Sequence, residues 1–296
     1  MGRKIHKILI IGASGLLGQS LFNKLNSNIF DTWGTFNSKL INSKKHFHLD
    51  ILKENFLEYL PNNDFDYVIM CSALTDQKFC QENPQISKLI NYKRTLDVIK
   101  FYLSRGAFIV FPSTSLVFDG NKKFPETEDK KNPISDYAKN KSMVEDYLLK
   151  LYPDRISIVR LTKIIGKDFP LFSNWINQII NKEKVFPFKD MFFSPISALL
   201  AVECIENIIL MNKAGITHVS ASGDISYFNA LTFIADKLRL DHKLINPKSY
   251  LDVDRRLFVP RFSSLGTKSL SRINISTPKP NSSLVQYIKN KSNELL

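Results

Sequence analysis

A tyrosine and a lysine in the stretch "ISDYAKNKSMVEDYL" could form a proton-transfer pair. Tyr137 and Lys141 follow Pro133 and a capping Ser135 or Asp136, a pattern typical of a helix start. Residues four apart share a helix face, with Cβ atoms about 5–6 Å apart. An unperturbed tyrosine has a pKa of about 10, so we expect Lys141 and a nearby cofactor charge to lower the pKa of Tyr137 towards neutrality. The same spacing occurs on ordinary surface helices, so neighbouring motifs decide its meaning.

A glycine-rich turn in "ILIIGASGLLGQSLFNKL" predicts a nucleotide-binding loop. Gly12, Gly15 and Gly18 lie between an apolar strand and an amphipathic helix. The first glycine permits a tight turn, the second lets backbone N–H groups approach a pyrophosphate, and the third allows close packing of helix on strand. The alternative is a connector without a ligand. The residues whose backbone or hydroxyl would face the phosphates are Ser14, Leu16 and Leu17.

The end of the second predicted strand indicates which dinucleotide fits. In "FDTWGTFNSKL" the strand ends on Asn37, Ser38 and Lys39, with no acid to bond a ribose 2′-hydroxyl. The polar donors and the lysine favour NADP(H), with NAD(H) as the alternative. This preference would not hold if Lys39 is only a surface charge. Asp50, followed by Ile51, could accept from the adenine amino group or cap a helix over residues 51–60.

A third group of polar side chains follows a buried strand in "FPSTSLVFDG". Ser113, Thr114 and Ser115 stand at the strand's carboxyl end, where ligands bind in open parallel sheets. Their hydroxyls would point into the site, although serine and threonine also serve in ordinary turns.

The elements that must position these residues alternate along the first half of the chain. Apolar runs such as "ILII", "YVIM" and "FIVF" suit strands covered on both faces. The sequence predicts an α/β fold: a Rossmann-type doubly wound parallel sheet with helices on both faces and a small C-terminal α/β substrate lobe. Strands are predicted in 7–13, 30–36, 46–51, 65–73, 106–115, 155–166 and 215–222, and helices in 15–26, 51–60, 85–106, from 136, and 282–296.

The domain organisation expected is a cofactor-binding domain over 1–165, with returning segments from about 190–222, and a mainly substrate-binding lobe over 166–296. Beyond Gly166 the pattern indicates a helix, a short strand and a long helix before the strand at 215–222. No repeat or low-complexity linker separates the two regions.

Composition bounds the remaining classes. The 296 residues are 44% hydrophobic, and no apolar run approaches a membrane span. Three cysteines without metal-ligand spacing indicate reduced thiols and a cytoplasmic protein. The net charge of +13 comes from scattered lysines without a nucleic-acid motif, so a small anionic ligand and a solvated surface explain it better than nucleic acid.

Together these motifs resemble the extended short-chain dehydrogenase/reductases, and within them the dTDP-4-dehydrorhamnose reductase group, which also includes the regulatory beta subunit of methionine adenosyltransferase. The similarity spans nearly the full length. The segments that carry it are "IGASGLLGQSL", "CSALTDQKFCQENPQISKLIN" with Asn91 in its characteristic place, "STSLVFDG", "YAKNK", "IVRLTKIIG", "DMFFSPISALLA", "GITHVSAS" and "VPRFSSLGTKSL".

The resemblance implies roles for individual residues. Thr114 would bond the substrate carbonyl, Tyr137 would donate the proton, and Lys141 would lower the pKa of Tyr137 and hold the nicotinamide ribose. Cys71, Ser72 and Ala73 would join the residues already named around the cofactor. The substrate side would include Thr75, Ser115, Lys163 and Arg261, with Ser115 where the group has an acid and Lys163 where it has a tryptophan.

The activity implied is reduction of a 4-keto group on a nucleotide-linked deoxysugar, with hydride from NADPH, in surface-polysaccharide precursor synthesis. The partner is then a small nucleotide sugar, and a homodimer remains open. Substitutions on the substrate side leave two alternatives: a cofactor-binding regulatory subunit like the methionine adenosyltransferase beta chain, or a nucleotide-sugar epimerase of the same superfamily.

Overall fold

The computed structural model describes residues 5–27, 29–38, 44–252 and 260–295. The chain divides into two units, which are described separately. The first comprises residues 1–117, 131–160 and 202–217, and the second 118–130, 161–201 and 218–296.

A seven-stranded sheet organises the first unit, in the order β3-β2-β1-β4-β5-β6-β10. The pairs β1–β2, β1–β4, β2–β3 and β4–β5 are parallel. Strand order therefore reverses between β1 and β4, the point at which a doubly wound sheet opens a crevice beyond its carboxyl ends. The strands are β1 (His6–Ile11), β2 (Phe30–Phe36), β3 (His46–His48), β4 (Tyr67–Met70), β5 (Phe108–Thr114), β6 (Ile156–Leu161) and β10 (Gly215–Val219).

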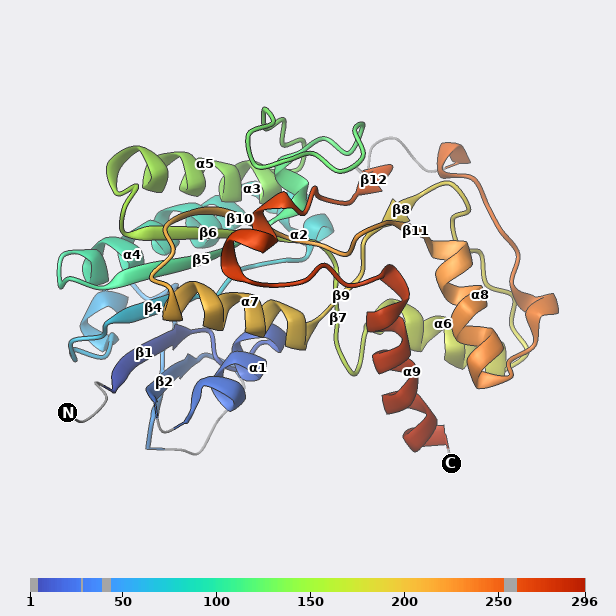
Figure 1. Ribbon diagram of the computed structural model, residues 1–296, viewed down its shortest axis with the longest axis horizontal. Helices are drawn as coiled ribbons and strands as arrows, with labels where there is room; N and C mark the ends of the chain where they lie inside the picture. Colours follow the sequence, from blue (N-terminus) through green and yellow to red (C-terminus); the bar gives the residue numbers. More distant parts are fainter. Residues whose placement is uncertain (1–4, 28, 39–43, 253–259, 296) are drawn as a thin grey trace. The chain divides into compact units, whose positions relative to one another are not determined.

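Helices cover both faces of this sheet (Figure 1). α4 (Thr95–Leu103) and α5 (Asp136–Leu151) lie on one face, and α1 (Leu16–Leu25) and α7 (Ala198–Leu210) on the other. The doubly wound parallel fold predicted from the sequence is confirmed. The remaining elements of this unit are η1 (Phe56–Tyr59), α2 (Gln77–Glu82), α3 (Pro84–Lys88), the π-helical η2 (Leu89–Arg94) and the 3-10 turn η3 (Ser115–Val117).

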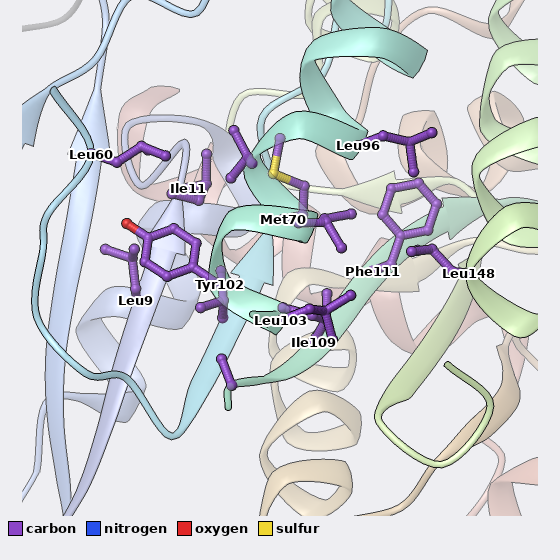
Figure 2. Packing of buried hydrophobic residues seen from close by; sticks show 14 of the residues in the cluster. Leu9, Ile11, Leu60, Met70, Leu96, Tyr102, Leu103, Ile109, Phe111 and Leu148 are labelled. Carbon is purple, nitrogen blue, oxygen red and sulfur yellow. The ribbon is translucent and has the colours of Figure 1, made fainter. Parts of the chain in front are cut away.

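The core of the first unit forms between the sheet and the helices on the α4 and α5 face. Figure 2 shows Leu9 and Ile11 of β1, Met70 of β4 and Phe111 of β5 among its side chains. Each is at most 1% exposed. Continuous burial along β4, β5 and the last four residues of β1 explains why these segments are unbroken apolar runs in the sequence.

Two predicted elements differ in the structure. Residues 51–60 do not form a helix but turns that lead into η1, since the Asp50 carboxylate accepts from Leu52 N at 3.0 Å and closes a local turn. The helix predicted over 85–106 is interrupted by the π-helical η2, whose extra residue the periodicity did not reveal. α2 and α8 were not predicted.

The described residues of the second unit form short strands and three longer helices. Its sheets are β11-β8-β12 and β7-β9, and its core includes Phe172, Phe193, Tyr227 and Tyr287. The described helices of the whole chain include none with the length and apolarity to cross a bilayer. The elements are β7 (Ile164–Ile165), α6 (Pro170–Ile180), β8 (Phe192–Phe193), β9 (Ile196–Ser197), β11 (Ile225–Ser226), α8 (Tyr227–Leu238), η4 (His242–Leu244), η5 (Tyr250–Asp252), β12 (Phe262–Ser263), η6 (Lys268–Ile273) and α9 (Pro280–Leu295).

The glycine turn between β1 and α1 is fixed by close packing. A Cβ on Gly18 would lie 2.2 Å from the carbonyl oxygen of Gly12, whereas a Cβ on Gly15 would lie at an ordinary 3.6 Å from the same atom. Gly18 therefore allows helix α1 to sit directly on the turn, as the sequence predicts for the third glycine.

Replacing Gly18 with alanine should lower the free energy of unfolding by about 1–3 kcal/mol, because the helix must move away from the turn. Thermal unfolding measures this, with Gly15→Ala as the matched control whose stability should stay near that of the wild type. Equal melting temperatures for the two variants would contradict the packing argument.

Candidate functional site

A pocket of about 180 Å³ lies at the carboxyl ends of β1 and β4. Its walls come from the glycine turn, the end of β2, the segment after β3 and the segment after β4. This is the crevice expected where the strand order reverses. The lining residues are Ile11, Gly12, Ser14, Gly15, Thr35, Phe36, Asn37, Leu49, Ile51, Cys71, Ser72 and Ala73.

Half of the residues predicted around the cofactor meet in this pocket, whereas Tyr137, Lys141 and six others are not part of its lining. Leu16 is 52% exposed at the start of α1, and Gly18 packs against the backbone of Gly12 and does not line the pocket. Asp50 does not line the pocket, and its carboxylate closes a turn to Leu52 N instead of capping a helix; its contact with adenine stays a prediction. Leu17 is partly buried, Ser38 is exposed, and both are absent from the lining; Lys39 lies outside the described residues.

The pocket also contains residues that the sequence did not single out. Thr35 Oγ1 accepts from Gly12 N at 3.0 Å, and Ala13 N donates to Thr35 O at 2.7 Å, so β2 holds the glycine turn. Phe36 and Leu49 supply apolar wall. The roles of these residues depend on the strand order, which no local pattern reveals.

The pocket fits a nicotinamide dinucleotide. Gly12 has φ of +88°, and a Cβ there would lie 2.8 Å from Ser72 N, so only glycine leaves the two strand ends this close. The N-cap of α1 is Gly15, with no side-chain cap, so the first N–H groups of the helix are available to a pyrophosphate. The residues that would hold the cofactor are Gly12, Ser14, Gly15, Asn37, Ile51, Cys71, Ser72, Ala73, Tyr137 and Lys141.

Helix α5 carries the tyrosine and lysine predicted to transfer protons. Its N-cap is Ser135, whose hydroxyl accepts from Ala138 N at 3.3 Å, so Tyr137 lies in the first turn. Tyr137 is 9% exposed and Lys141 is 3% exposed. Both side chains are thus buried, on the face of α5 that packs against the rest of the first unit.

The pKa of Tyr137 differs from the sequence-based expectation. Burial raises the pKa of the phenol, and the neighbouring Cys80 thiol raises it further, whereas Lys141 does not lower it. The prediction that Lys141 lowers the pKa of Tyr137 was wrong, because the spacing of two residues along a helix does not report how deeply they are buried. A phenol with a raised pKa stays protonated at neutral pH and can therefore act as a proton donor.

The Lys141 ammonium is buried against an aromatic ring. Its Nζ lies 3.9 Å from the centroid of the Phe111 ring, and no acceptor among the described residues hydrogen-bonds to it. Burial lowers the pKa of Lys141 to about 8, while the Glu145 carboxylate and the Cys71 side chain act to raise it. Lys141 is therefore a cation near neutrality that has donors available for the hydroxyl groups of a ligand.

Thr114 ends strand β5 and is 8% exposed. Its Oγ1 accepts from Leu116 N at 3.2 Å, which leaves the hydroxyl proton without an acceptor in the described part of the chain. The hydroxyl can therefore donate to a ligand carbonyl. Ser113 instead donates to Glu145 Oε1 at 2.5 Å, so its hydroxyl does not point into the site as predicted.

Asn91 holds the pocket wall that follows β4. From the π-helical η2, its Oδ1 accepts from Leu74 N at 2.8 Å and its Nδ2 donates to Leu74 O at 2.9 Å. The side chain is 1% exposed, and Nδ2 also approaches Ser87 Oγ at 3.4 Å. Asn91 thus pairs with Leu74 as a strand neighbour would, next to Ala73 in the pocket wall.

The predicted substrate residues are distributed over both units. Thr75 is exposed and Ser115 is buried in the first unit, whereas Lys163 is partly buried and Arg261 is exposed in the second. Their roles remain predictions.

Comparison with known proteins gives a match for residues 6–293 to the family described as RmlD substrate binding domain. The probable low-salt glycan biosynthesis reductase Agl14 of Haloferax volcanii is 26% identical over 270 residues, 88% of this chain and 90% of that protein. Methionine adenosyltransferase 2 subunit beta of Bos taurus is 25% identical over 146 residues, 49% of this chain and 43% of that protein. A dTDP-4-dehydrorhamnose reductase of Bacillus anthracis in complex with NADP has a TM-score of 0.81 and 22% identity, covering 98% and 99% of the two chains.

The Rossmann sheet and the pocket at its switch point are those of a dinucleotide-binding fold, and the family match with its reductase relatives makes the chain an NAD(P)-dependent oxidoreductase of the extended short-chain dehydrogenase/reductase type. Within that class, the chain belongs to the RmlD substrate-binding-domain family, which is a family of sugar-nucleotide reductases.

Replacing Lys141 with methionine should weaken NADPH binding and abolish the fall in NADPH affinity at alkaline pH. In the wild type, Lys141 is charged below its pKa of about 8 and loses the charge as pH rises, so affinity should fall above pH 8. Fluorescence titration of NADPH across the pH range measures this. An unchanged alkaline decline in Lys141→Met would assign the titration to another group.

The same variant should be more stable than the wild type at pH 7, by about 1–3 kcal/mol, because it removes a buried charge. The advantage should shrink between pH 8 and the usual lysine value of 10.5, where the unfolded wild type binds more protons than the folded one. Denaturant unfolding at several pH values tests the sign.

Replacing Asn91 with alanine should loosen the wall after β4, since Leu74 N and O lose their partners at a cost of about 1–3 kcal/mol. NADPH affinity should fall with stability. Asn140→Ala is the matched control, because Asn140 Nδ2 donates to the same Ser87 Oγ at 3.1 Å but does not contact Leu74. Equal cofactor affinities in the two variants would exclude the role of Asn91 in holding the wall.

Proposed function

We propose that this chain reduces the 4-keto group of a nucleotide-linked deoxysugar with NADPH, in the synthesis of a surface-polysaccharide or glycan precursor. The observation that carries the proposal is the pair of buried donors, Tyr137 and Lys141, on the helix beside the strand that ends in Thr114. Family membership supports a sugar nucleotide as the substrate, and the match to a probable glycan biosynthesis reductase over 88% of this chain supports the pathway.

The proposed chemistry divides between the residues of the site. The bound nicotinamide cofactor supplies the hydride that reduces the carbonyl carbon. Thr114 donates its hydroxyl proton in a hydrogen bond to the carbonyl oxygen, since Leu116 N already occupies a lone pair of Oγ1. Tyr137 transfers its phenolic proton to that oxygen as negative charge develops, which gives the alcohol. The resulting phenolate regains a proton from water.

Burial of the three groups favours this chemistry. Hydrogen bonds and charges act more strongly where water is excluded, so a developing oxyanion gains more from Thr114 and Lys141 than it would in solution. An alkoxide is more basic than a phenolate, so the raised pKa of Tyr137 does not prevent transfer towards the substrate. The Lys141 charge stabilises the negative charge that develops at the site, without itself giving up a proton.

The test of the substrate class is NADPH oxidation with dTDP-, GDP-, UDP- and CDP-linked 4-keto sugars. We expect turnover with at least one of them and none with the free sugars, because the nucleotide anchors the reacting ring. Tight NADPH binding without any turnover would overturn the reductase proposal. In that case a regulatory subunit becomes the better interpretation, consistent with the match to methionine adenosyltransferase 2 subunit beta over about half of this chain.

Replacing Tyr137 with phenylalanine should lower kcat by about 10²–10⁴-fold, because the proton donor is lost while the ring remains. The NADPH dissociation constant should change little. Tyr147→Phe, on the same helix but with its ring under Lys100 Nζ at 4.7 Å, is the matched control and should retain kcat. A parallel loss of kcat and cofactor affinity in Tyr137→Phe would make the residue structural.

A further inference from the structure

A buried carboxylate joins the two elements that carry the proposed catalytic groups. Glu145 of α5 is 0% exposed, and its Oε1 accepts from Ser113 Oγ of β5 at 2.5 Å. Ser113 directly precedes Thr114, and Glu145 lies one helical turn after Lys141 and two turns after Tyr137.

Two cations complete the partners of this carboxylate. Arg160, near the end of β6 and 2% exposed, donates through Nη2 to Glu145 Oε2 at 2.8 Å and through Nε to both oxygens at 3.2 Å. Lys131 Nζ donates to Oε2 at 3.2 Å. Burial alone would raise the pKa of Glu145, but these donors hold it below its usual value, so the group is an anion. Each carboxylate oxygen thus has several donors.

The face of β5 that packs against α5 contacts two successive turns of that helix. Phe111 and Ser113 alternate with Pro112 on β5 and share one face. Lys141 Nζ lies over the Phe111 ring, and Glu145 bonds the Ser113 hydroxyl. A shift of the strand end along the helix would disturb both contacts together.

Stability alone does not account for this arrangement. Burying an ion pair costs desolvation energy that its attraction scarcely repays, and well-packed apolar residues of similar volume are often at least as stabilising. A carboxylate with fixed, directional donors does define a geometry, and catalytic groups depend on placement to within fractions of an ångström.

We propose that Glu145 is a positioning residue, which holds the end of β5 through Ser113 so that the Thr114 hydroxyl is placed relative to Tyr137 and Lys141. Its kinetic consequence rests on the proposed function, because it concerns a carbonyl that Thr114 and Tyr137 both contact. Its structural consequence does not depend on the substrate.

The experiment compares Ser113→Ala with Ser157→Ala. Ser113→Ala removes the bond to Glu145 but keeps the Glu145 and Arg160 ion pair. Ser157 lies on the neighbouring β6 at 0% exposure, and its Oγ has no hydrogen-bond partner among the described residues, so its loss is a matched control. Melting temperatures of both variants verify folding.

Ser113→Ala should lower kcat about tenfold or more, with the NADPH dissociation constant within about twofold of the wild type. Ser157→Ala should leave both values unchanged. Ser113→Thr, which restores a hydroxyl on a strand, should recover most of kcat. The Ser113→Ala change should add little further loss in a Glu145→Gln background, because the two residues act as a unit.

Amide hydrogen exchange gives a readout that is independent of turnover. The segments 113–117 and 136–141 should exchange faster in Ser113→Ala than in Ser157→Ala or the wild type. If no sugar nucleotide is reduced by the wild type, the proposed function fails, and exchange alone decides the positioning role. If Ser113→Ala matches Ser157→Ala in exchange, and in kcat where turnover exists, the positioning role is overturned.

Discussion

The buried charge of Lys141 is the constraint to which the rest of the site is adapted. Lys141 is 3% exposed and its ammonium rests on the Phe111 ring, with no hydrogen-bond acceptor among the described side chains or carbonyls. A cation in this position is costly, and the protein offsets the cost only in part, through the aromatic face and the negative charge of Glu145. The part of the desolvation cost that the folded chain does not offset can be offset by a ligand that brings oxygen atoms to the ammonium. The buried lysine therefore lowers the stability of the free protein and favours binding of such a ligand, compared with an apolar residue at this position.

Holding the Lys141 ammonium in place requires a rigid backbone at the ends of the strands. Beyond the last ladder pair of a strand, backbone N–H and C=O groups lose their neighbours, and side chains replace them here. Thr35 supports the turn after β1, Asn91 supports the segment after β4, and Ser113 with Glu145 supports the end of β5. All three act at the carboxyl edge of the sheet, where the pocket lies. The edge that binds the cofactor is thus reinforced by polar side chains, whereas the centre of the sheet depends on apolar packing.

Local patterns in the sequence were sufficient for much of the fold. The strands β1, β2 and β5 and the helices α1 and α5 were predicted because continuous apolar runs and helical spacing report directly on burial. Residues 51–60 were wrongly predicted as a helix, since their apolar spacing suits one, whereas the Asp50 side chain closes a turn instead. α8 was not predicted, although its Ser226 cap and the helical spacing of Tyr227, Ala230, Leu231 and Ile234 mark it in the sequence.

The site was predictable to the extent that its residues form motifs. The glycine turn and the Tyr137 and Lys141 pair are contiguous in sequence, and so could be found. The roles of Thr35 and Leu49 arise only when β2 and β3 take their places in the sheet, and Ser113 meets Glu145 across 32 residues. The raised pKa of Tyr137 was missed because spacing describes the neighbours of a group along the helix but not how deeply it is buried.

The π-helical η2 has a consequence for how this region tolerates changes of length. A π turn contains an extra residue compared with an α turn, and Thr95 Oγ1 bonds Ile90 O at 2.9 Å where the regular ladder is interrupted. Loss of one residue between 89 and 94 would restore a regular helix and rotate everything after it by about 100°. Either Asn91 would leave Leu74, or Val98 and Ile99 would leave the core. The extra residue therefore acts as a phase adjustment, which lets one helix serve the pocket wall at its start and the hydrophobic core at its end.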